Sequence, residues 1–317
     1  MASTSPNTPS PASLQDLMQD ENAKEGISNN APTSFWRDAG RRLLRDRLTM
    51  TAVVVILIIL AISLAAEPIS ALVGVDPFDT DLLAQFDPPS REHLLGADDL
   101  GQDQFTRLIY AARISLGIGF FSAFFILTIG ISLGMVAAYF GGIVDDTIMW
   151  LINTLNSIPQ LYLLLILGAL FEITPVVLVI IFGLTSWPFT TRLVRSQVYS
   201  LKERDFIMAS QAIGSSTFFI ITRHILPNVV PTVMIVAARA VGNLMLAEAI
   251  LSFIGFGVRP PTPTWGNMLT KSQQYVFEFW DRWYLILPAG IMITITVLCV
   301  FIIGDGLRDA FDPRLKQ

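Results

Sequence analysis

The residue types that most often perform chemistry are scarce in this chain. Its 317 residues include two histidines, His93 and His224, and one cysteine, Cys299. Neither an HExxH nor a CxxC pattern occurs, so we expect no metal site of ordinary spacing. Cys299 lies in an apolar run and has no second cysteine to pair with, which predicts a small packing residue.

A nucleotide-binding loop is missing as well. The phosphate-binding pattern GxxxxGK[ST] is most nearly approached between Gly266 and Ser272, where Thr270 stands in the place of the second glycine. We therefore expect no cofactor in this chain and no ATP hydrolysis by the chain alone. An enzyme that acts inside a membrane is disfavoured too, because the apolar segments hold no histidine and no pair of carboxylates.

The composition indicates a membrane protein. Hydrophobic residues make up 52% of the chain and charged residues 15%, and the mean hydropathy is +0.57. A soluble domain carries roughly a quarter charged residues, so this shortfall fits a surface that faces lipid. Apolar runs that can cross roughly 30 Å of hydrocarbon predict an all-α, polytopic protein with about six transmembrane helices, at 48–66, 109–140, 147–171, 174–194, 229–251 and 283–303.

The charges beside the first span predict its orientation. Residues 34–47 interleave apolar side chains with five arginines, which predicts either a basic amphipathic helix on the membrane surface or a plain basic flank. The stretch 67–107 holds nine acidic residues, and its basic residues are Arg91 and Arg107. Because basic residues stay in the cytoplasm, we expect both termini inside and this loop outside.

These patterns divide the chain into four parts. Residues 1–33 are polar and rich in Ser, Pro and Asn, which predicts a disordered cytoplasmic tail. The surface helix 34–47 follows, then 48–108 with the first span and the external loop. The part 109–317 is predicted to be a core of five transmembrane helices with a cytoplasmic loop at 195–228.

The third predicted span is irregular. Gly141, Gly142, Asp145 and Asp146 predict a tight turn before it. Pro159 lies inside the span and removes one internal hydrogen bond, which predicts a kink.

The loop at 195–228 is long for a simple connection, and long loops in compact proteins are commonly functional. Apolar residues recur at helical spacing from Phe206 to Ile213, and Gly214 interrupts them. A second short helix is predicted to end at Leu226-Pro227-Asn228. Two short helices that meet at a glycine beside the membrane suit docking into a groove of a soluble partner.

The spacing in this loop resembles the "EAA" coupling loop in permease subunits of binding-protein-dependent ABC importers. Two letters depart from that pattern, because Met208 replaces its acid and Ser210 its second alanine; His224 fills the apolar position, as in the peptide branch. Upstream acids are candidates to replace the missing one. The candidate coupling residues are Glu203, Asp205, Met208, Ala209, Ser210, Gly214, His224, Leu226 and Pro227.

Other stretches resemble the peptide and nickel branch of the same family, in particular its C-type permease. They begin with Leu95-Gly96-Ala97-Asp98 and end with Gly304-Asp305-Gly306-Leu307, and together they extend the likeness over roughly 35–317. The runs that carry it are 95–116, 139–142, 246–249, 251–269 and 304–314. The resemblance implies the fold of a type I ABC importer permease, also called MetI-like.

The resemblance also implies partners. A second homologous permease would complete the pore, two ATP-binding subunits with their ATP and Mg²⁺ would dock from the cytoplasm, and an extracytoplasmic solute-binding protein would deliver di- or oligopeptides. The chain would be multi-pass in the inner (plasma) membrane bilayer, with no nucleic-acid partner. Import of a nickel chelate, glutathione or another small solute is the alternative, and a secondary transporter without ATPases is a remoter one.

Polar residues in the fifth span are candidates for the pore. Arg239 and Asn243 lie four residues apart, on one helix face. Charge inside a membrane usually faces a cavity, which predicts pore lining; a structural pair with the partner permease is the alternative. Glu248 is about half a turn out of phase with Arg239 and nearer the outer face, where either a solute contact or a structural role at an outer gate is expected.

Two external features have open interpretations. Asp98, Asp99 and Asp103 suit helix capping and solvation, with cation binding as the alternative. The segment from Pro260 to Trp265 predicts a rigid external stretch packed at the membrane interface, with receptor contact as the alternative.

Overall fold

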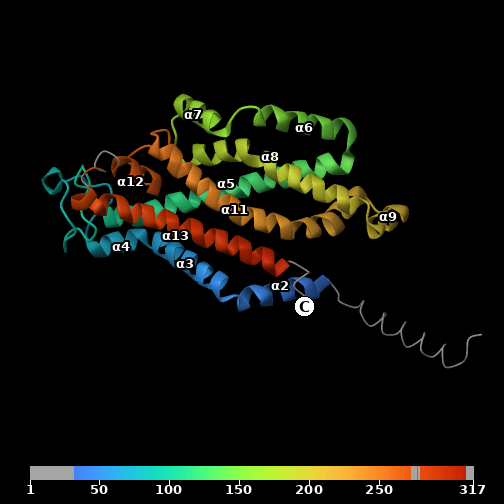
Figure 1. Ribbon diagram of the computed structural model, residues 1–317, viewed down its shortest axis with the longest axis horizontal. Helices are drawn as coiled ribbons and strands as arrows, with labels where there is room; N and C mark the ends of the chain where they lie inside the picture. Colours follow the sequence, from blue (N-terminus) through green and yellow to red (C-terminus); the bar gives the residue numbers. More distant parts are fainter. Residues whose placement is uncertain (1–31, 273–276, 278, 312–317) are drawn as a thin grey trace, which may run out of the picture.

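The helices of the protein lie along one long axis (Figure 1). The computed structural model describes residues 32–272, 277 and 279–311, so nearly all of the predicted tail 1–33 falls outside it. The described residues hold helices and one isolated β-bridge, which confirms the all-α prediction. In chain order the helices are α2 (Pro32–Arg45), α3 (Arg47–Leu64), α4 (Ala66–Val73), η1 (Leu82–Ala84), α5 (Gln104–Phe140), α6 (Gly142–Asn156), α7 (Gln160–Leu170), α8 (Pro175–Lys202), α9 (Asp205–Ala212), α10 (Thr217–Phe219), η2 (Ile220–Ile225), α11 (Leu226–Phe253), α12 (Trp265–Ser272) and α13 (Phe279–Phe311).

Five described helices are long and apolar enough to cross a membrane, and α6 with α7 forms a sixth span if the bent pair is counted as one. This agrees with the predicted number of about six. The expected kink at Pro159 is a full break, with a bend of 78° between α6 and α7. Pro159 has no N–H to donate, so it ends one helical ladder and stands as the N-cap of the next. The predicted turn is shorter than expected, because α6 already begins at Gly142 and includes Asp145.

Helices α5 and α8 approach closely because small residues stand where they meet. A Cβ on Gly130 would come within 2.6 Å of the Thr190 side chain, and one on Gly134 within 2.8 Å of the Thr191 carbonyl oxygen. Glycines four residues apart lie on one helix face, an arrangement that lets helix backbones pack tightly in membranes. The two glycines thus set the spacing of the α5–α8 interface, the most extensive contact between two helices in the described residues.

The bundle has two distinct ends. At the α12 end, Trp265 is fully buried: its indole N–H donates to the Leu108 carbonyl and its backbone N–H to the Ser115 hydroxyl. Trp265 therefore anchors α12 in the core, and the position of the segment from Pro260 to Trp265 at a membrane interface stays a prediction. At the α9 end, α2 folds against the end of α13, where Trp36 packs edge-on against Phe311 at 5.6 Å. The position of α2 on a membrane surface stays a prediction.

The acidic residues at the α12 end are bound by the protein itself. Asp103 is the N-cap of α5 and accepts from the Thr106 N–H at 2.7 Å, as predicted. Asp98 is buried rather than solvated, and it accepts from the ammonium group of Lys271 at 3.0 Å. A protein cation thus occupies the place that the alternative interpretation gave to a bound ion.

Replacing Gly134 with alanine tests the α5–α8 interface. Alanine favours a helix over glycine by about 1 kcal/mol, but here the added methyl group collides with the backbone of α8. Overpacking of this kind costs about 1–3 kcal/mol, so we expect the detergent-solubilised Gly134→Ala protein to unfold at a lower temperature. Gly117→Ala on the same helix is the control, because a Cβ added at Gly117 would lie 4.0 Å from its nearest neighbour, the Phe121 side chain. Equal melting temperatures for the two variants would contradict the proposed role of the contact.

Candidate functional site

The short helix α9 presents an apolar face away from the bundle. Ile207 and Ser210 are buried, whereas Met208 and Ala209 are exposed, and Ile213, which follows the helix, is 83% exposed. Asp205 stands in the first turn, where a negative charge stabilises the helix N-terminus. Glu203 is the exposed C-cap of α8. The predicted coupling residues therefore divide into a buried anchor and an outward face.

Gly214 shapes the turn after α9. Its φ is +80°, a left-handed conformation that residues with a Cβ adopt at a cost. The turn closes through two backbone hydrogen bonds, from the Gly214 N–H to Gln211 and from the Ser215 N–H to Ser210. This geometry agrees with the interruption that the sequence predicted at this glycine.

Apolar packing holds α9 against two other helices. Ile207 belongs to a buried cluster with Val198 of α8, Ile220 of η2 and Val229 of α11. The His224 ring lies 6.0 Å from the ring of Phe206 on α9 and 5.5 Å from that of Phe219. A displacement of α9 would therefore act on α8 and, through η2, on α11.

The predicted helix end at Leu226-Pro227-Asn228 is wrong. One helical rod runs from Thr217 to Phe253 through the π-helical turn η2. The Leu226 N–H donates to Ile221, five residues back, and the wider turn accommodates Pro227, which has no N–H. The side-chain amide of Asn228 donates to the His224 carbonyl at 2.6 Å. The proline begins α11 without interrupting the rod.

A polar clamp that the sequence did not predict joins α6 to the C-terminal part of α8. Asp145 accepts from Nε and Nη2 of Arg195 at 2.5 and 2.6 Å, and from the Tyr199 hydroxyl at 2.8 Å. Lys202 donates to the carbonyls of Ala138 and Tyr139 at the end of α5. These bonds explain why α8 continues to Lys202, past the predicted span end at residue 194.

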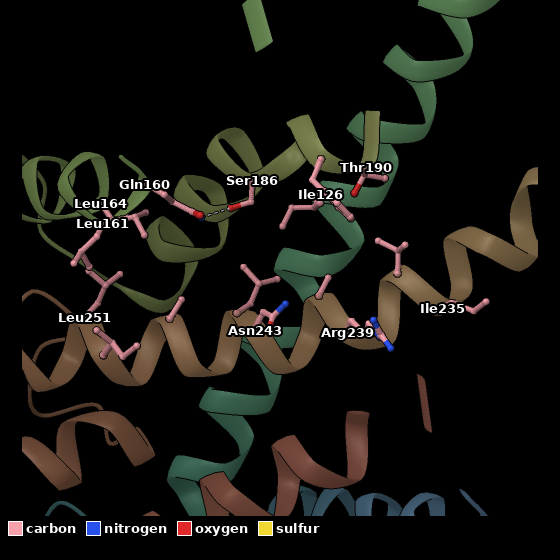
Figure 2. A pocket seen from close by; sticks show the side chains of 16 residues that line it. Ile126, Gln160, Leu161, Leu164, Ser186, Thr190, Ile235, Arg239, Asn243 and Leu251 are labelled. Carbon is pink, nitrogen blue, oxygen red and sulfur yellow. Dashed lines mark hydrogen bonds between the residues drawn. The ribbon is translucent and has the colours of Figure 1, made fainter. Parts of the chain in front are cut away.

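A cavity of 580 Å³ lies on one side of the bundle, between α7, α8 and α11 (Figure 2). Most of its lining is apolar. The side-chain amide of Gln160 donates to the Ser186 hydroxyl at 3.0 Å across the gap between α7 and α8. The polar residues that line the cavity are Gln160, Ser186, Thr190, Arg239 and Asn243.

Two of the three predicted pore residues line this cavity. Arg239 and Asn243 line it from α11, four residues apart as their spacing predicts (Figure 2). Arg239 also donates from Nη2 to Asp305 of α13 at 2.8 Å. A role in a pore stays a prediction, and so does a contact with a second permease.

Glu248 faces the interior of the protein and does not line the cavity. Its Oε1 accepts from the hydroxyls of Ser252 and Thr264, both at 2.8 Å, and the residue is buried. These bonds join α11 to the segment before α12. In this arrangement Glu248 has a structural contact and no access to a solute in the cavity.

Gln160, Ser186 and Thr190 carried a signal that the sequence reading did not use. Ser186 and Thr190 are four residues apart in an apolar span, and Gln160 directly follows the helix-breaking proline. Polar side chains at such positions inside a membrane usually face other protein or a water-filled cavity.

Comparison with known families agrees with this architecture. The family described as "Binding-protein-dependent transport system inner membrane component" matches residues 130–317. The family described as "N-terminal TM domain of oligopeptide transport permease C" matches residues 34–89. A solved structure titled as an inward facing conformation of the MetNI methionine ABC transporter shares the fold, with a TM-score of 0.50 and 21% identity over 65% of this chain and 97% of that chain.

Similar proteins match over nearly their whole length. The chain is 36% identical to the dipeptide transport system permease protein DppC of Alkalihalophilus pseudofirmus, covering 90% of this chain and 91% of the relative. It is 35% identical to the oligopeptide transport system permease protein OppC of Escherichia coli, covering 89% and 92%. The protein belongs to the family of binding-protein-dependent transport system inner membrane components and is a C-type permease within it.

Proposed function

We propose that the chain forms one half of the translocation pore of an ATP-driven importer of di- and oligopeptides and couples that pore to cytoplasmic ATPases. The proposal depends on one observation. The buried face of α9 packs against α8 and against η2, which continues into α11, and α8 and α11 supply most of the cavity lining. A partner that pulls or pushes α9 would therefore change the shape of the cavity.

The chemistry of the α9 end supports a docking role. Ile213, Phe218 and Met208 are large, apolar and exposed, and apolar side chains gathered on a surface mark interaction sites. Helix α9, which carries Met208, projects beyond the rest of the bundle (Figure 1). A groove on an ATP-binding subunit would bury these side chains, and ATP binding and hydrolysis would then move α9 between two positions, as in alternating access.

Peptide as the solute is supported by the relatives and by the cavity. The relatives named above are dipeptide and oligopeptide permeases. The carboxamides of Gln160 and Asn243 and the hydroxyls of Ser186 and Thr190 can exchange hydrogen bonds with the peptide groups of an extended solute. The apolar remainder of the lining tolerates varied side chains.

The remaining partners follow from the same assignment. A second homologous permease would cover the open side of the cavity, and a solute-binding protein would approach the α12 end, which carries the loop predicted to be external. Two ATP-binding subunits would bind ATP and Mg²⁺, one of them at α9. The chain itself would perform no catalysis.

The Ile213→Asp variant tests docking. Burying an apolar side chain of this size contributes about 1.5–3 kcal/mol, so we expect a loss of about tenfold or more in co-purified ATP-binding subunits, with a matching loss of ATP-dependent peptide uptake in vesicles. Leu72→Asp on α4 is the control, because Leu72 is 88% exposed at the other end of the bundle.

Equal losses in both variants would reject α9 as the docking site. Wild-type vesicles that accumulate a nickel chelate and no peptide would reject peptide as the solute.

Cysteine labelling tests the orientation. Leu83 is 96% exposed at the α12 end and Phe218 is 77% exposed near α9, while the native Cys299 is buried. In right-side-out vesicles, we expect a membrane-impermeant maleimide to label Leu83→Cys at once and Phe218→Cys only after permeabilisation. The wild-type protein measures the background from Cys299. The reverse labelling order would place α9 outside and contradict the coupling role.

A further inference from the structure

Arg239 is the one charged residue among those lining the 580 Å³ cavity in the described part of the chain. It also lines a smaller neighbouring hollow of 290 Å³, together with Asn243, Phe301 and Asp305. Arg239 and Asn243 therefore form the boundary between the two spaces. Each of these side chains is accessible from the large cavity and also from the smaller hollow that Asp305 lines.

The ion pair of Arg239 with Asp305 is built loosely. One hydrogen bond of 2.8 Å joins Nη2 to Oδ1, and the two side chains are 51% and 62% exposed. The clamp of Arg195 with Asp145 in the same protein is bidentate and much less exposed. A guanidinium group presents five N–H donors. Arg239 uses one of them for Asp305, whereas Arg195 uses two for Asp145, so Arg239 has more donors left for a ligand.

Glycine contacts place the pair beside the first turn of α3. Gly304 packs against Ala238 and Arg239, and Gly306 packs against Thr49 in the first turn of α3. Arg239 is thus level with the beginning of a membrane-spanning helix. The cavity continues along α11 to Leu251, twelve residues or about 18 Å away. A solute that follows the cavity along α11 meets the Arg239 side chain on its wall.

We propose that Arg239, assisted by Asn243, binds the carboxylate of a solute in passage, and that Asp305 occupies the guanidinium when no solute is present. A guanidinium fork matches a carboxylate in geometry as well as in charge, and the Asn243 amide offers a further donor one turn along the helix. The ligand class is an organic carboxylate, and for a peptide it is the free C-terminus. This inference rests on the proposed import of peptides and names the group that the pore recognises.

Exchange between two carboxylates keeps the guanidinium of Arg239 paired throughout. With Asp305 bound, the arginine is neutralised and the path carries no unpaired cation. When the solute carboxylate takes its place, Asp305 is released toward water, to which it is already exposed. The exchange breaks no covalent bond and moves no proton.

A charge-swap series in the complete transporter, reconstituted in vesicles with ATP, distinguishes this role from a structural ion pair. We expect Arg239→Gln to lower the uptake of a tripeptide at least tenfold, and Asp305→Asn to keep it within threefold of wild type. The double variant Arg239→Asp with Asp305→Arg should stay as low as Arg239→Gln, because the cation has left the cavity wall. Arg192→Gln is the control, since Arg192 bonds to Asn153 outside the cavity lining.

Restored uptake in the double variant, or equal losses in Arg239→Gln and Asp305→Asn, would overturn the proposal in favour of a structural pair. Unchanged uptake in Arg239→Gln would overturn it as well. Amounts of each assembled complex, measured by co-purification, show whether a variant has failed to fold, and uptake is compared per assembled complex. Should Arg239→Gln fail to assemble, Arg239→Lys replaces it, with an expected loss of threefold or more because the ammonium group lacks the fork.

A pair of peptides separates this inference from the proposed function. The same tripeptide is offered with a free C-terminal carboxylate and as its C-terminal amide. We expect Arg239→Gln to lower uptake of the acid relative to wild type and to leave the small uptake of the amide unchanged. If both fall equally, carboxylate recognition is rejected while peptide import stands. If wild type carries neither, peptide import itself fails. If the wild-type transporter takes up only the acid, the charge-swap series decides whether Arg239 recognises the carboxylate.

Discussion

The close approach of α5 and α8 is the constraint on which the other contacts of the bundle depend. Gly130 and Gly134 leave room for the backbone of α8, and this spacing brings the end of α5 within reach of Lys202. It also aligns Val194 and Val198 with Ile207, so that the loop helix α9 packs on a surface that α5 and α8 build together. A wider separation of α5 and α8 would loosen the surface on which α9 packs before it changed the cavity.

The proposed docking helix and the cavity involve the same two helices, α8 and α11. The rod from Thr217 to Phe253 carries the contacts of α9 at one end and the polar residues of the cavity further along. Helix α8 does the same, with the Asp145 clamp near α9 and Ser186 and Thr190 on the cavity. Both helices are continuous between these points, so the proposed movement of the loop would reach the cavity through them.

Hydropathy alone located the spans, because a 30 Å apolar layer demands long apolar runs whatever their packing. Pairings between distant residues were out of its reach: Asp145 and Arg195 are 50 residues apart, and their contact exists only once α6 and α8 lie side by side. The bonds of Trp265 to Ser115 and Leu108 are of the same kind, because they join residues 150 and 157 positions apart. Pro227 was taken as a helix end because the π-helical turn that accommodates it has no signature in the residue types.

The break between α6 and α7 fixes which side of the protein can touch lipid. The first turn of α7 has no side-chain cap, so its leading N–H groups need acceptors that acyl chains do not provide. Gln160 and the exposed bond between Arg192 and Asn153 lie on the same side. That flank must be solvated or buried against another polypeptide, whereas Phe121, Phe124 and Leu298 can face hydrocarbon. The single break between α6 and α7 therefore determines how this subunit is rotated about the membrane normal.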